Sequence, residues 1–350
     1  MNRFSKYISN FNNIWAEKCS NYSKLPNVLP ATERIIVIGD IHGDMNVLLE
    51  CLKKAKVIES NITVGTLNKI EWLGGTTTIV QVGDQIDSCR FDGINSCNDP
   101  SNYKVDEAHD ITILYFMTNL HTMAQKHGGA VYNLMGNHEL MNIRGDMSYV
   151  SHSNVTKYNY KKTDGTMMYG LEARKHLFSP GNEIANFLAC TRNIALIIGS
   201  NLFVHAGIVP HITKKYNIND LNVLLKMLLF DELKNPQIFN DIFMSKKTSP
   251  LWTRIFGNIK STENKCDELM EPLMSVYKVG KIYVGHTPQL KTGIVSACND
   301  RVWLTDAGMP TAFNKFDDKY IETNGKNISE SRHAQVLEIL KDGETINILK

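Results

Sequence analysis

The chain has 350 residues, of which 43% are hydrophobic and 21% are charged, a composition typical of a globular protein with a substantial core. Its 38 basic and 36 acidic residues leave a formal net charge of +2, which excludes binding to nucleic acid or to an anionic membrane through bulk charge. The sequence has no signal-peptide core and no apolar run of about 18 residues. This predicts no membrane segment and an intracellular, cytoplasmic protein.

Seven cysteines are spread along the chain, and no two of them form a C-x-x-C motif. The odd number and the reducing interior of the cell argue against a disulfide framework, and the missing motif argues against a zinc knuckle. Cys89 and Cys97 fall in one loop and could be bridged, but a reducing compartment favours free thiols there too. The sequence therefore predicts buried or unreactive thiols.

The first part of the chain predicts a helix and then a strand–loop–helix unit. Within residues 1–32, apolar residues spaced by three and four indicate an amphipathic helix that packs on the main body. The run Ile35 to Ile38 predicts a short buried strand, and the apolar spacing from Asn46 to Val57 predicts the helix after it. A second strand is expected at Thr77 to Val82.

The middle of the chain contains an irregular loop between further predicted elements. Asp87 to Asp106 is rich in Asn, Asp and Ser and has no periodic pattern, so we expect a functional loop there. A helix is predicted at Glu107 to Gln125 and a third strand at Ala130 to Met135. Residues 149–170 are polar and indicate an excursion or lid. Helical spacing returns from Met167 to Ala189, with a break near Pro180 and Gly181.

The remaining elements are predicted from apolar runs separated by turn residues. They are a hairpin of Ile194 to Ile198 with Leu202 to Val204, helices at Leu221 to Leu233 and Leu269 to Val279, strands at Lys281 to Val284 and Arg301 to Thr305, and a terminal hairpin of Ala334 to Leu340 with Thr345 to Leu349.

Polar residues that bind metals follow most of these strands. Asp40 and His42 alone would equally fit a charged surface turn, but similar residues recur after later strands, where loops supply the chemistry of a sheet. Carboxylate, amide and imidazole ligands without thiolates suit Mn, Fe or Zn, and six ligands exceed one tetrahedral site. Two metal ions are therefore expected. The ligand set is Asp40, His42, Asp84, Asn137, His205 and His286, and His138 lies beside Asn137.

Five motifs, in a fixed order along the chain, resemble those of a known family. They are G-D-I-H-G-D, G-D-Q-I-D, G-N-H-E, H-A-G and G-H-T, which begin at Gly39, Gly83, Gly136, His205 and Gly285. Together they resemble the motifs of the calcineurin-like metallophosphoesterases. The strings G-N-H-E-L-M-N-I-R-G-D, S-P-L-W-T-R, G-H-T-P-Q and D-A-G-M look particularly like the Shewanella-like branch of the phosphoprotein phosphatases.

The resemblance implies an α/β (mixed α+β) fold, a four-layer αββα sandwich of two mixed sheets flanked by helices. It implies a dinuclear metal-dependent phosphomonoesterase, most similar to protein phosphatases, that uses metal-bound hydroxide and forms no covalent enzyme intermediate. Phosphorylated proteins or small phosphoesters are the implied substrates. Because no linker divides the sequence, we expect one catalytic domain over residues 33–350, with a helical extension at residues 1–32 and insertions near residues 88–105 and 149–170.

The resemblance also assigns roles to the motif residues. The first Asp and His of the ligand set would hold one metal ion, Asp84 would bridge both, and the last three residues would hold the second. His138 would be the general acid that protonates the leaving oxygen, and Asp87 would orient its imidazole. Glu139 and Asp44 would either orient the surrounding shell or simply lie at helix N-termini.

The chain departs from the family pattern at the phosphate clamp. The family places Arg directly after the second Asp of G-D-x-x-D, whereas Ser88 and Cys89 precede Arg90 here. Arg offers a bidentate fork for phosphate oxygens that Ser cannot replace. Arg90 in a shifted loop, Arg254 and Arg144 are the candidate clamps, although each would also fit a surface or structural arginine.

Two other functions stay open at this point. A nucleotide or dinucleoside polyphosphate phosphohydrolase would use the same metal core, because the core alone does not choose the substrate. A non-catalytic, metal-bound scaffold for phosphorylated partners is favoured only by Ser88 in the place of Arg. Relative rates on phosphopeptides and dinucleoside polyphosphates would distinguish this phosphohydrolase from a protein phosphatase. Turnover above background would exclude the non-catalytic scaffold.

Overall fold

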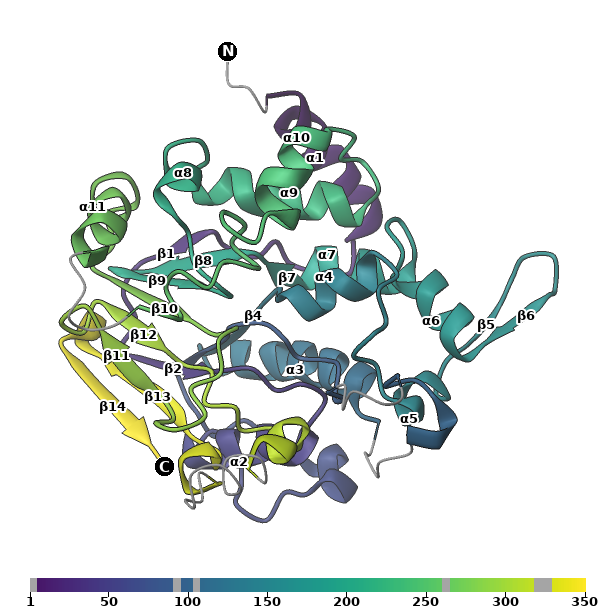
Figure 1. Cartoon of the computed structure of the whole chain (residues 1–350), viewed down its shortest axis with the longest axis horizontal. Coiled ribbons are helices and arrows are strands. Elements are labelled where there is room, and N and C mark those ends of the chain that lie inside the picture. The colour runs from purple at the N-terminus through teal and green to yellow at the C-terminus, as the bar shows by residue number, and fades with distance from the viewer. Residues whose placement is uncertain (1–4, 91–95, 103–107, 260–264, 318–328) are drawn as a thin grey trace.

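The computed structural model describes the chain apart from five short stretches (Figure 1). The stretches outside the description are residues 1–4, 91–95, 103–107, 260–264 and 318–328. Much of the predicted insertion near residues 88–105 and part of the loop after Phe316 therefore lie outside the described residues. The predicted division of the chain into one catalytic domain and an N-terminal extension stays a prediction.

The first sheet is mixed and, within the described residues, has six strands in the order β1-β8-β9-β10-β12-β11. Strands β9, β10 and β12 run parallel, whereas β8 and β9 form the antiparallel hairpin that the sequence predicts. The strands are β1 (Val28–Leu29), β8 (Ala195–Ile198), β9 (Asn201–Val204), β10 (Lys281–Val284), β11 (Val295–Ala297) and β12 (Val302–Leu304).

The second sheet has the order β14-β13-β2-β3-β4-β7 within the described residues. Its central strands β2, β3 and β4 are parallel, with Ile36 opposite Ile79 and Val80 opposite Tyr132. The terminal hairpin that the sequence predicts is confirmed, and β13 also pairs antiparallel with β2. The strands are β2 (Arg34–Ile38), β3 (Thr78–Gln81), β4 (Ala130–Leu134), β7 (Arg192–Asn193), β13 (Val336–Leu340) and β14 (Thr345–Leu349).

Helices cover the outer faces of both sheets, which gives the four layers that the sequence predicts (Figure 1). Helices α1 and α9 lie above the first sheet in this view, and α2 and α3 lie below the second. The α-helices are α1 (Ser5–Lys18), α2 (Met45–Lys54), α3 (Asp110–Gln125), α4 (Asn137–Ile143), α5 (His152–Val155), α6 (Gly170–Phe178), α7 (Glu183–Thr191), α8 (Pro210–Thr213), α9 (Ile218–Leu229), α10 (Pro236–Phe239) and α11 (Lys265–Tyr277).

Shorter helical turns and a small hairpin complete the described structure. The turns are η1 (Val64–Lys69), η2 (Pro100–Asn102), η3 (Asn240–Met244), η4 (Thr311–Phe313), η5 (Ser329–Arg332) and η6 (Lys341–Gly343). The hairpin pairs β5 (Asn159–Lys161) with β6 (Met167–Tyr169) and projects from the main body (Figure 1). Met167 was expected to begin a helix, but the turn at Gly165 folds these residues back onto β5.

The apolar core consists of two clusters separated by the first sheet. Along β8, Leu196 and Ile198 belong to the cluster shared with the second sheet and with α2 and α3. Ala195 and Ile197 point to the opposite side and join the cluster of α1, α7 and α9. This alternation follows from the two-residue period of a strand. Because both faces of both sheets are covered, the strand ends are held in a rigid frame.

The prediction of free thiols is wrong, because six of the seven cysteines are paired. The disulfides are Cys19–Cys190, Cys89–Cys97 and Cys266–Cys298, whose partners are 171, 8 and 32 positions apart. The odd residue is Cys51, which is buried and forms no disulfide. An odd number of cysteines is thus compatible with three disulfides and one free thiol. The pairing depends on tertiary contacts that the spacing of cysteines in the sequence does not reveal.

No helix in the described part of the chain is long and apolar enough to cross a membrane. The cytoplasmic location stays a prediction, and the three disulfides weigh against it, because such bridges form and persist mainly in oxidising compartments.

Candidate metal centre

The candidate site lies where strands of both sheets end. Asp40 follows β2, Asp84 follows β3, and Asn137 follows β4 in the second sheet. His205 follows β9 and His286 follows β10 in the first sheet. Because each group of strands is parallel, the carboxyl ends meet at one edge, and loops bring the polar side chains together there.

The carboxylate of Asp84 lies at the centre of the predicted ligand set. Its Oδ2 is 3.8 Å from Nε2 of His42 and 3.4 Å from Nε2 of His205. Asp40 Oδ2 lies 3.9 Å from Nε2 of the same His42, and Asn137 Oδ1 lies 3.0 Å from Nε2 of His205. Asp84 thus lies between two groups of side chains, Asp40 with His42 and Asn137 with His205. This arrangement suits a carboxylate that is shared between two ions.

Backbone carbonyl groups orient three of the histidines. Nδ1 of His42 lies 3.2 Å from the carbonyl of Ile86, and Nδ1 of His205 lies 2.9 Å from that of Val82. In His286 it is Nε2 that meets a backbone carbonyl, at 3.1 Å. A carbonyl can only accept, so each of these nitrogens carries a hydrogen and the other ring nitrogen is directed toward the site.

Four residues of the site have left-handed backbone conformations, which are rare outside glycine. Their φ angles are 44° at His42, 54° at Asp84, 74° at Asp87 and 66° at His286. Each such conformation stores about 1–3 kcal/mol of strain that the surrounding structure must offset. The cluster at the strand ends indicates that the fold holds these side chains in one functional arrangement.

Two glycines of the sequence motifs leave space for the carboxylates. A Cβ atom on Gly136 would lie 2.1 Å from Oδ1 of Asp84, and one on Gly285 would lie 2.2 Å from Oδ1 of Asp40. Both contacts are far shorter than van der Waals distance. These positions therefore require glycine because of close approach to the site, which gives a physical reason for the G-N-H-E and G-H-T motifs.

Buried charges set the protonation of the site. Burial favours the neutral form of Asp84, but His205, His138 and His42 outweigh it and hold the pKa of Asp84 well below its usual value. Burial and the negative charges of Asp306 and Asp84 instead raise the pKa of Asp40. Burial and Asp84 likewise raise the pKa of Asp306 to about 6. Asp40, Asp84 and Asp306 thus lie in one buried space, where the repulsion between their negative charges favours the neutral forms of Asp40 and Asp306.

The donor set fits a bound cation. Nε2 of His205 faces two oxygens, Oδ1 of Asn137 at 3.0 Å and Oδ2 of Asp84 at 3.4 Å, and despite burial the negative charge of Asp84 raises the pKa of His205. These oxygens thus gather around one positively charged centre, a position that a bound metal ion would take in place of the proton on Nε2. Asp84 contributes to both described groups of possible metal ligands, His42–Asp84–His138 and Asp84–His205–His286. The residues present therefore fit the metal ions that the sequence predicts.

The predicted general acid is paired with the predicted orienting carboxylate. Nδ1 of His138 lies 2.9 Å from Oδ2 of Asp87, and both side chains are buried. The amide of Asn142 donates to both Asp87 oxygens, at 2.9 and 3.1 Å, and the fully buried Arg174 lies 3.3 Å from Oδ1. The carboxylate is thereby fixed, so the imidazole presents Nε2 toward the site.

Glu139 and Asp44, whose roles the sequence left open, differ in what they hold. Glu139 accepts from the backbone amides of Asp84, Gln85 and Gly136 at 3.1, 2.6 and 2.7 Å. It therefore fixes the turn that carries the central carboxylate. Asp44 caps α2 by accepting from the amide of Val47 at 3.0 Å.

The three candidate phosphate-binding arginines line one cavity with the metal-site residues. The cavity has a volume of about 480 Å³ and also includes His42, Asp84, His138 and Asp306. Arg254 donates to the carbonyl of His286 at 2.8 Å, which ties it to the site. Arg144 is exposed at the C-terminal end of α4. Which of the three binds phosphate stays a prediction.

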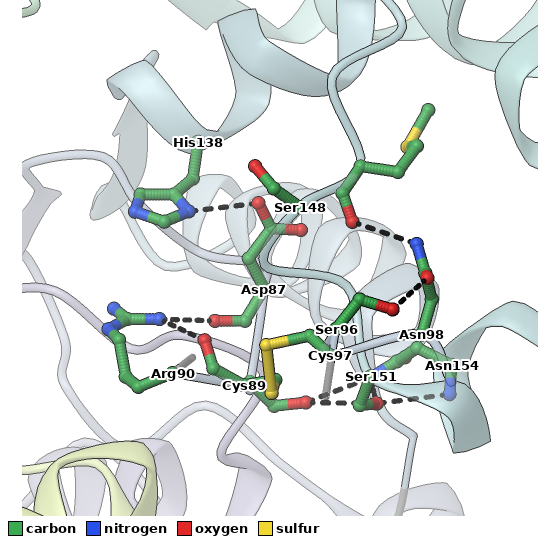
Figure 2. The surroundings of a disulfide bond; sticks show 12 residues. Asp87, Cys89, Arg90, Ser96, Cys97, Asn98, His138, Ser148, Ser151 and Asn154 are labelled. Carbon is green, nitrogen blue, oxygen red and sulfur yellow. Dashed lines mark hydrogen bonds and ion pairs between the residues drawn. A yellow bond between two sulfur atoms is a disulfide. The ribbon is translucent and has the colours of Figure 1, made fainter. Parts of the chain in front are cut away.

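Arg90 reaches the cavity from the shifted loop, next to a disulfide (Figure 2). Its Nη1 donates to the carbonyls of Asp87 and Cys89 at 3.0 and 2.9 Å. Its guanidinium lies over the rings of Phe313 and Tyr149, 4.7 and 5.5 Å from their centroids. Cys89, the neighbour of Arg90, is joined to Cys97, so the bridge fixes the backbone from which this arginine extends.

Sequence reasoning missed several residues that support the site. Arg174 and Asn142 hold Asp87, and Arg174 also lies 2.8 Å from Asp110, so a buried network connects α6, α4 and α3. None of these residues follows a strand, which is why the strand-end pattern did not select them. Asp306 was visible within the D-A-G-M string after β12 but was not assigned to the site.

Comparison with known families agrees with this geometry. The model of the calcineurin-like phosphoesterase family matches residues 33–290. The chain therefore belongs to the calcineurin-like phosphoesterase family and is a hydrolase of the metallophosphoesterase class. The match contains all five motifs and each residue of the predicted ligand set.

Individual proteins and a solved structure are also similar to this chain. An uncharacterized protein of Acanthamoeba polyphaga mimivirus is 35% identical over 65% of this chain and 96% of its own length. Shewanella-like protein phosphatase 2 of Arabidopsis thaliana is 27% identical over 79% of this chain and 71% of its own. The fold resembles that of a cold-active protein-tyrosine phosphatase of a psychrophilic Shewanella species, with a TM-score of 0.62 and 22% identity over 94% of this chain and 83% of that one.

Proposed function

We propose that the protein is a dinuclear metal-dependent phosphatase that removes phosphate from phosphorylated proteins. The observation that carries this proposal is the carboxylate of Asp84, which lies between two groups of nitrogen and oxygen ligands and beside the His138–Asp87 pair. Mn, Fe and Zn are the metals that suit such a thiolate-free set. When bound, two ions would activate a water molecule and draw charge from the phosphoryl oxygens.

The residues of the chain then have separate tasks in the reaction. Arg90, Arg144 and Arg254 bind phosphate oxygens and hold phosphorus in line with the attacking water. His138 carries a proton on Nε2 and gives it to the leaving oxygen as the phosphorus–oxygen bond breaks. Asp87 holds the other hydrogen on Nδ1 throughout, so the imidazolium becomes a neutral imidazole in the same orientation when it gives up the Nε2 proton. Water supplies the new oxygen of the released phosphate.

A phosphorylated protein fits the shape and the relatives of this site. The cavity opens at the surface through exposed cationic side chains, Arg144, Lys246 and Arg254, so a side chain that projects from another protein can enter. The names of two relatives, Shewanella-like protein phosphatases of Arabidopsis thaliana and Plasmodium berghei, support the same substrate class. The metal core would equally serve a dinucleoside polyphosphate, so the substrate must be tested directly.

Replacing Asp84 by Asn tests the proposed site. The substitution keeps the shape of the side chain but removes the charge that the two ligand groups share. We expect hydrolysis of an aryl phosphate to be abolished and the metal content of the purified protein to fall. Full activity with unchanged metal content would contradict the assignment.

The matched control is Asp146→Asn, because Asp146 is an exposed carboxylate that lines the same cavity and caps its own turn through Ser148. It should retain metal and most activity. Rates on phosphopeptides and on dinucleoside polyphosphates are measured in parallel. Preference for the dinucleoside polyphosphate would retain the metallophosphoesterase chemistry and exclude a protein phosphatase.

A further inference from the structure

A second groove, lined with cationic side chains, continues from the catalytic cavity. Its volume is about 360 Å³, and its cations are Lys246, Lys247, Arg254 and Lys265. Lys246 and Arg254 also line the catalytic cavity, so the two spaces are continuous. A molecule that places its phosphate at the metal centre therefore meets this groove with the atoms next to the phosphate.

The charged side chains that line the groove in the described part of the chain are all cationic. No carboxylate lines it among the residues that the structure describes. Lys246 and Lys247 are exposed on the turn after η3, and neither forms an ion pair within the described residues. Asp267, two positions after Lys265, lies 2.7 Å from Arg301 and is thus occupied elsewhere. Lysines around a concave surface attract acidic groups and steer them toward it.

Hydrogen bonds fix the backbone on two sides of the groove. Ser245 Oγ accepts from the amide of Lys247 at 3.3 Å, and the carbonyl of Ser245 accepts from the amide of Ser249 at 2.9 Å. On the other side, the carbonyl of Arg254 accepts from the amide of Asn258 at 3.0 Å. The groove is therefore formed before any ligand binds, which lowers the entropy lost on binding.

Apolar side chains lie between these cations. Ile255 is 41% exposed, and Ile259 and Leu269 are buried at the base of the groove. A polyphosphate chain would pair with the lysines but would leave this apolar surface in contact with water. A peptide that carries both acidic and apolar side chains would satisfy both kinds of surface.

We propose that the groove binds the segment of a protein substrate next to its phosphorylated residue and selects segments with acidic residues beside an apolar one. This inference rests on the proposed phosphatase function and adds a substrate class to it. Lys247 and Lys265 belong to the groove and not to the catalytic cavity, so they determine specificity without contact with the phosphate.

The test compares peptides that share one phosphorylated residue and differ in its neighbours. One peptide has acidic and isoleucine neighbours, a second has lysines in place of the acids, and a third has neutral polar residues throughout. We expect kcat/KM to be highest for the acidic peptide. The double variant Lys247→Gln/Lys265→Gln should lower kcat/KM for that peptide by about three- to tenfold, mainly through KM, because each exposed charge contributes modestly.

The double variant should leave hydrolysis of an aryl phosphate unchanged, since that substrate does not reach the groove. The matched control is Lys69→Gln/Lys126→Gln, two exposed lysines that line neither space, and it should retain the preference for the acidic peptide.

Equal kcat/KM for the three peptides, or an unchanged preference in the groove variant, would overturn the inference while the phosphatase function stood. A rate loss confined to dinucleoside polyphosphate would also overturn it. If aryl phosphate were hydrolysed and every phosphopeptide were inert, the protein phosphatase function itself would fail.

Discussion

Arg90 follows the one departure from the family motifs that the sequence indicates. Ser88 stands where the sequence resemblance places this arginine, and its Oγ lies 3.3 Å from Oγ of Ser151 and accepts from the amide of Asn154 at 3.1 Å. The guanidinium two residues later still lines the cavity, because the shifted backbone is tied down by the Cys89–Cys97 bridge and by the carbonyl of Asp87. Under the proposed function, the Cys89–Cys97 disulfide would take over the task of placing a phosphate-binding arginine.

Removing this bridge should weaken substrate binding without loss of the metals. In the double variant Cys89→Ser/Cys97→Ser, we expect KM for an aryl phosphate to rise about tenfold, because Arg90 loses its fixed starting point and a charged hydrogen bond contributes about 1.5–3 kcal/mol. Steady-state kinetics together with metal analysis measures the effect. Arg90→Ala should give a similar increase.

Combining Arg90→Ala with loss of the bridge should add little, because both changes remove the same interaction. The control is Cys266→Ser/Cys298→Ser, which opens another disulfide whose cysteines do not line the cavity. Additive effects, or an unchanged KM in the bridge variant, would show that the disulfide does not position Arg90.

The sequence predicted the candidate metal ligands, but it did not predict the residues that hold the general acid pair in place. Asp84, His205 and His286 were selected because each follows an apolar strand, and the structure brings them together. Arg174 and Asn142 were missed because a helix interior carries no comparable signal. The contacts that make them important are made across the fold, to a carboxylate 87 positions away in the case of Arg174.

At the scale of single elements, helix α9 contains a buried lysine that forms no ion pair with the carboxylates of the described residues. Lys226 is buried, and its ammonium donates to the carbonyl of Arg192 at 2.6 Å and to Oδ1 of Asn193 at 2.8 Å. Burial lowers the pKa of Lys226 to about 7, since no carboxylate offsets the loss of hydration. We therefore expect the stability of the protein around α9 to change with pH.

Lys226 should make folding less favourable at neutral pH than at alkaline pH. The unfolded chain binds this proton up to its ordinary pKa near 10.5, whereas the folded chain releases it near 7, so stability rises with pH between these values. Between pH 7 and 9 we expect the free energy of unfolding of the wild type to gain about 1–2 kcal/mol relative to Lys226→Met. Urea unfolding at both pH values measures the difference.

Using the difference between the two proteins cancels the other groups that titrate in this range. Lys126→Met provides the exposed control and should track the wild type at both pH values. A wild type that gains no stability over Lys226→Met as the pH rises would show that this lysine stays charged in the folded protein.

Strands with simple apolar runs were predicted most closely. Strand β10 has the predicted bounds, and β4 ends one residue early, because burial on both faces leaves an uninterrupted apolar string. Short strands were the failures. Residues Met167–Tyr169 form β6 and not a helix, and Val28–Leu29 were not predicted at all, since both depend on partners elsewhere in the chain.

The whole molecule is held together by contacts between distant parts of the chain. Cys19 lies directly after α1 and is joined to Cys190 in α7, across 171 positions. No spacing rule relates these residues, so the sequence could not reveal the bridge. The groove beside the catalytic cavity also depends on separate parts of the chain, because the turn after η3, the segment from Arg254 to Ile259 and helix α11 each supply part of its lining.

Opening the Cys19–Cys190 bridge should affect stability and leave catalysis intact. We expect Cys19→Ser/Cys190→Ser to lower the free energy of unfolding by about 2–5 kcal/mol, because the bridge closes a long loop in the unfolded chain. Urea unfolding measures this loss. The Cys89–Cys97 bridge closes only 8 positions and should contribute less. Activity on an aryl phosphate in the absence of denaturant should not change.

Equal losses of stability in the two bridge variants would contradict this expectation, and so would a loss of activity in Cys19→Ser/Cys190→Ser. The comparison therefore separates a disulfide that stabilises the fold from one that places a functional side chain.

The pairing of β13 with β2 has a consequence for synthesis of the protein. Arg34 at the start of β2 forms an ion pair with Glu338 of β13, 304 positions downstream, and the ladder between them covers the open side of the strand that leads to Asp40. On the ribosome, β2 is complete long before β13 emerges. Until then, Ile35 to Ile38 present an apolar strand edge that can pair with another nascent chain. We therefore expect the first strand of the site to need shielding by a chaperone during translation, and the catalytic site to form only after most of the chain has left the exit tunnel.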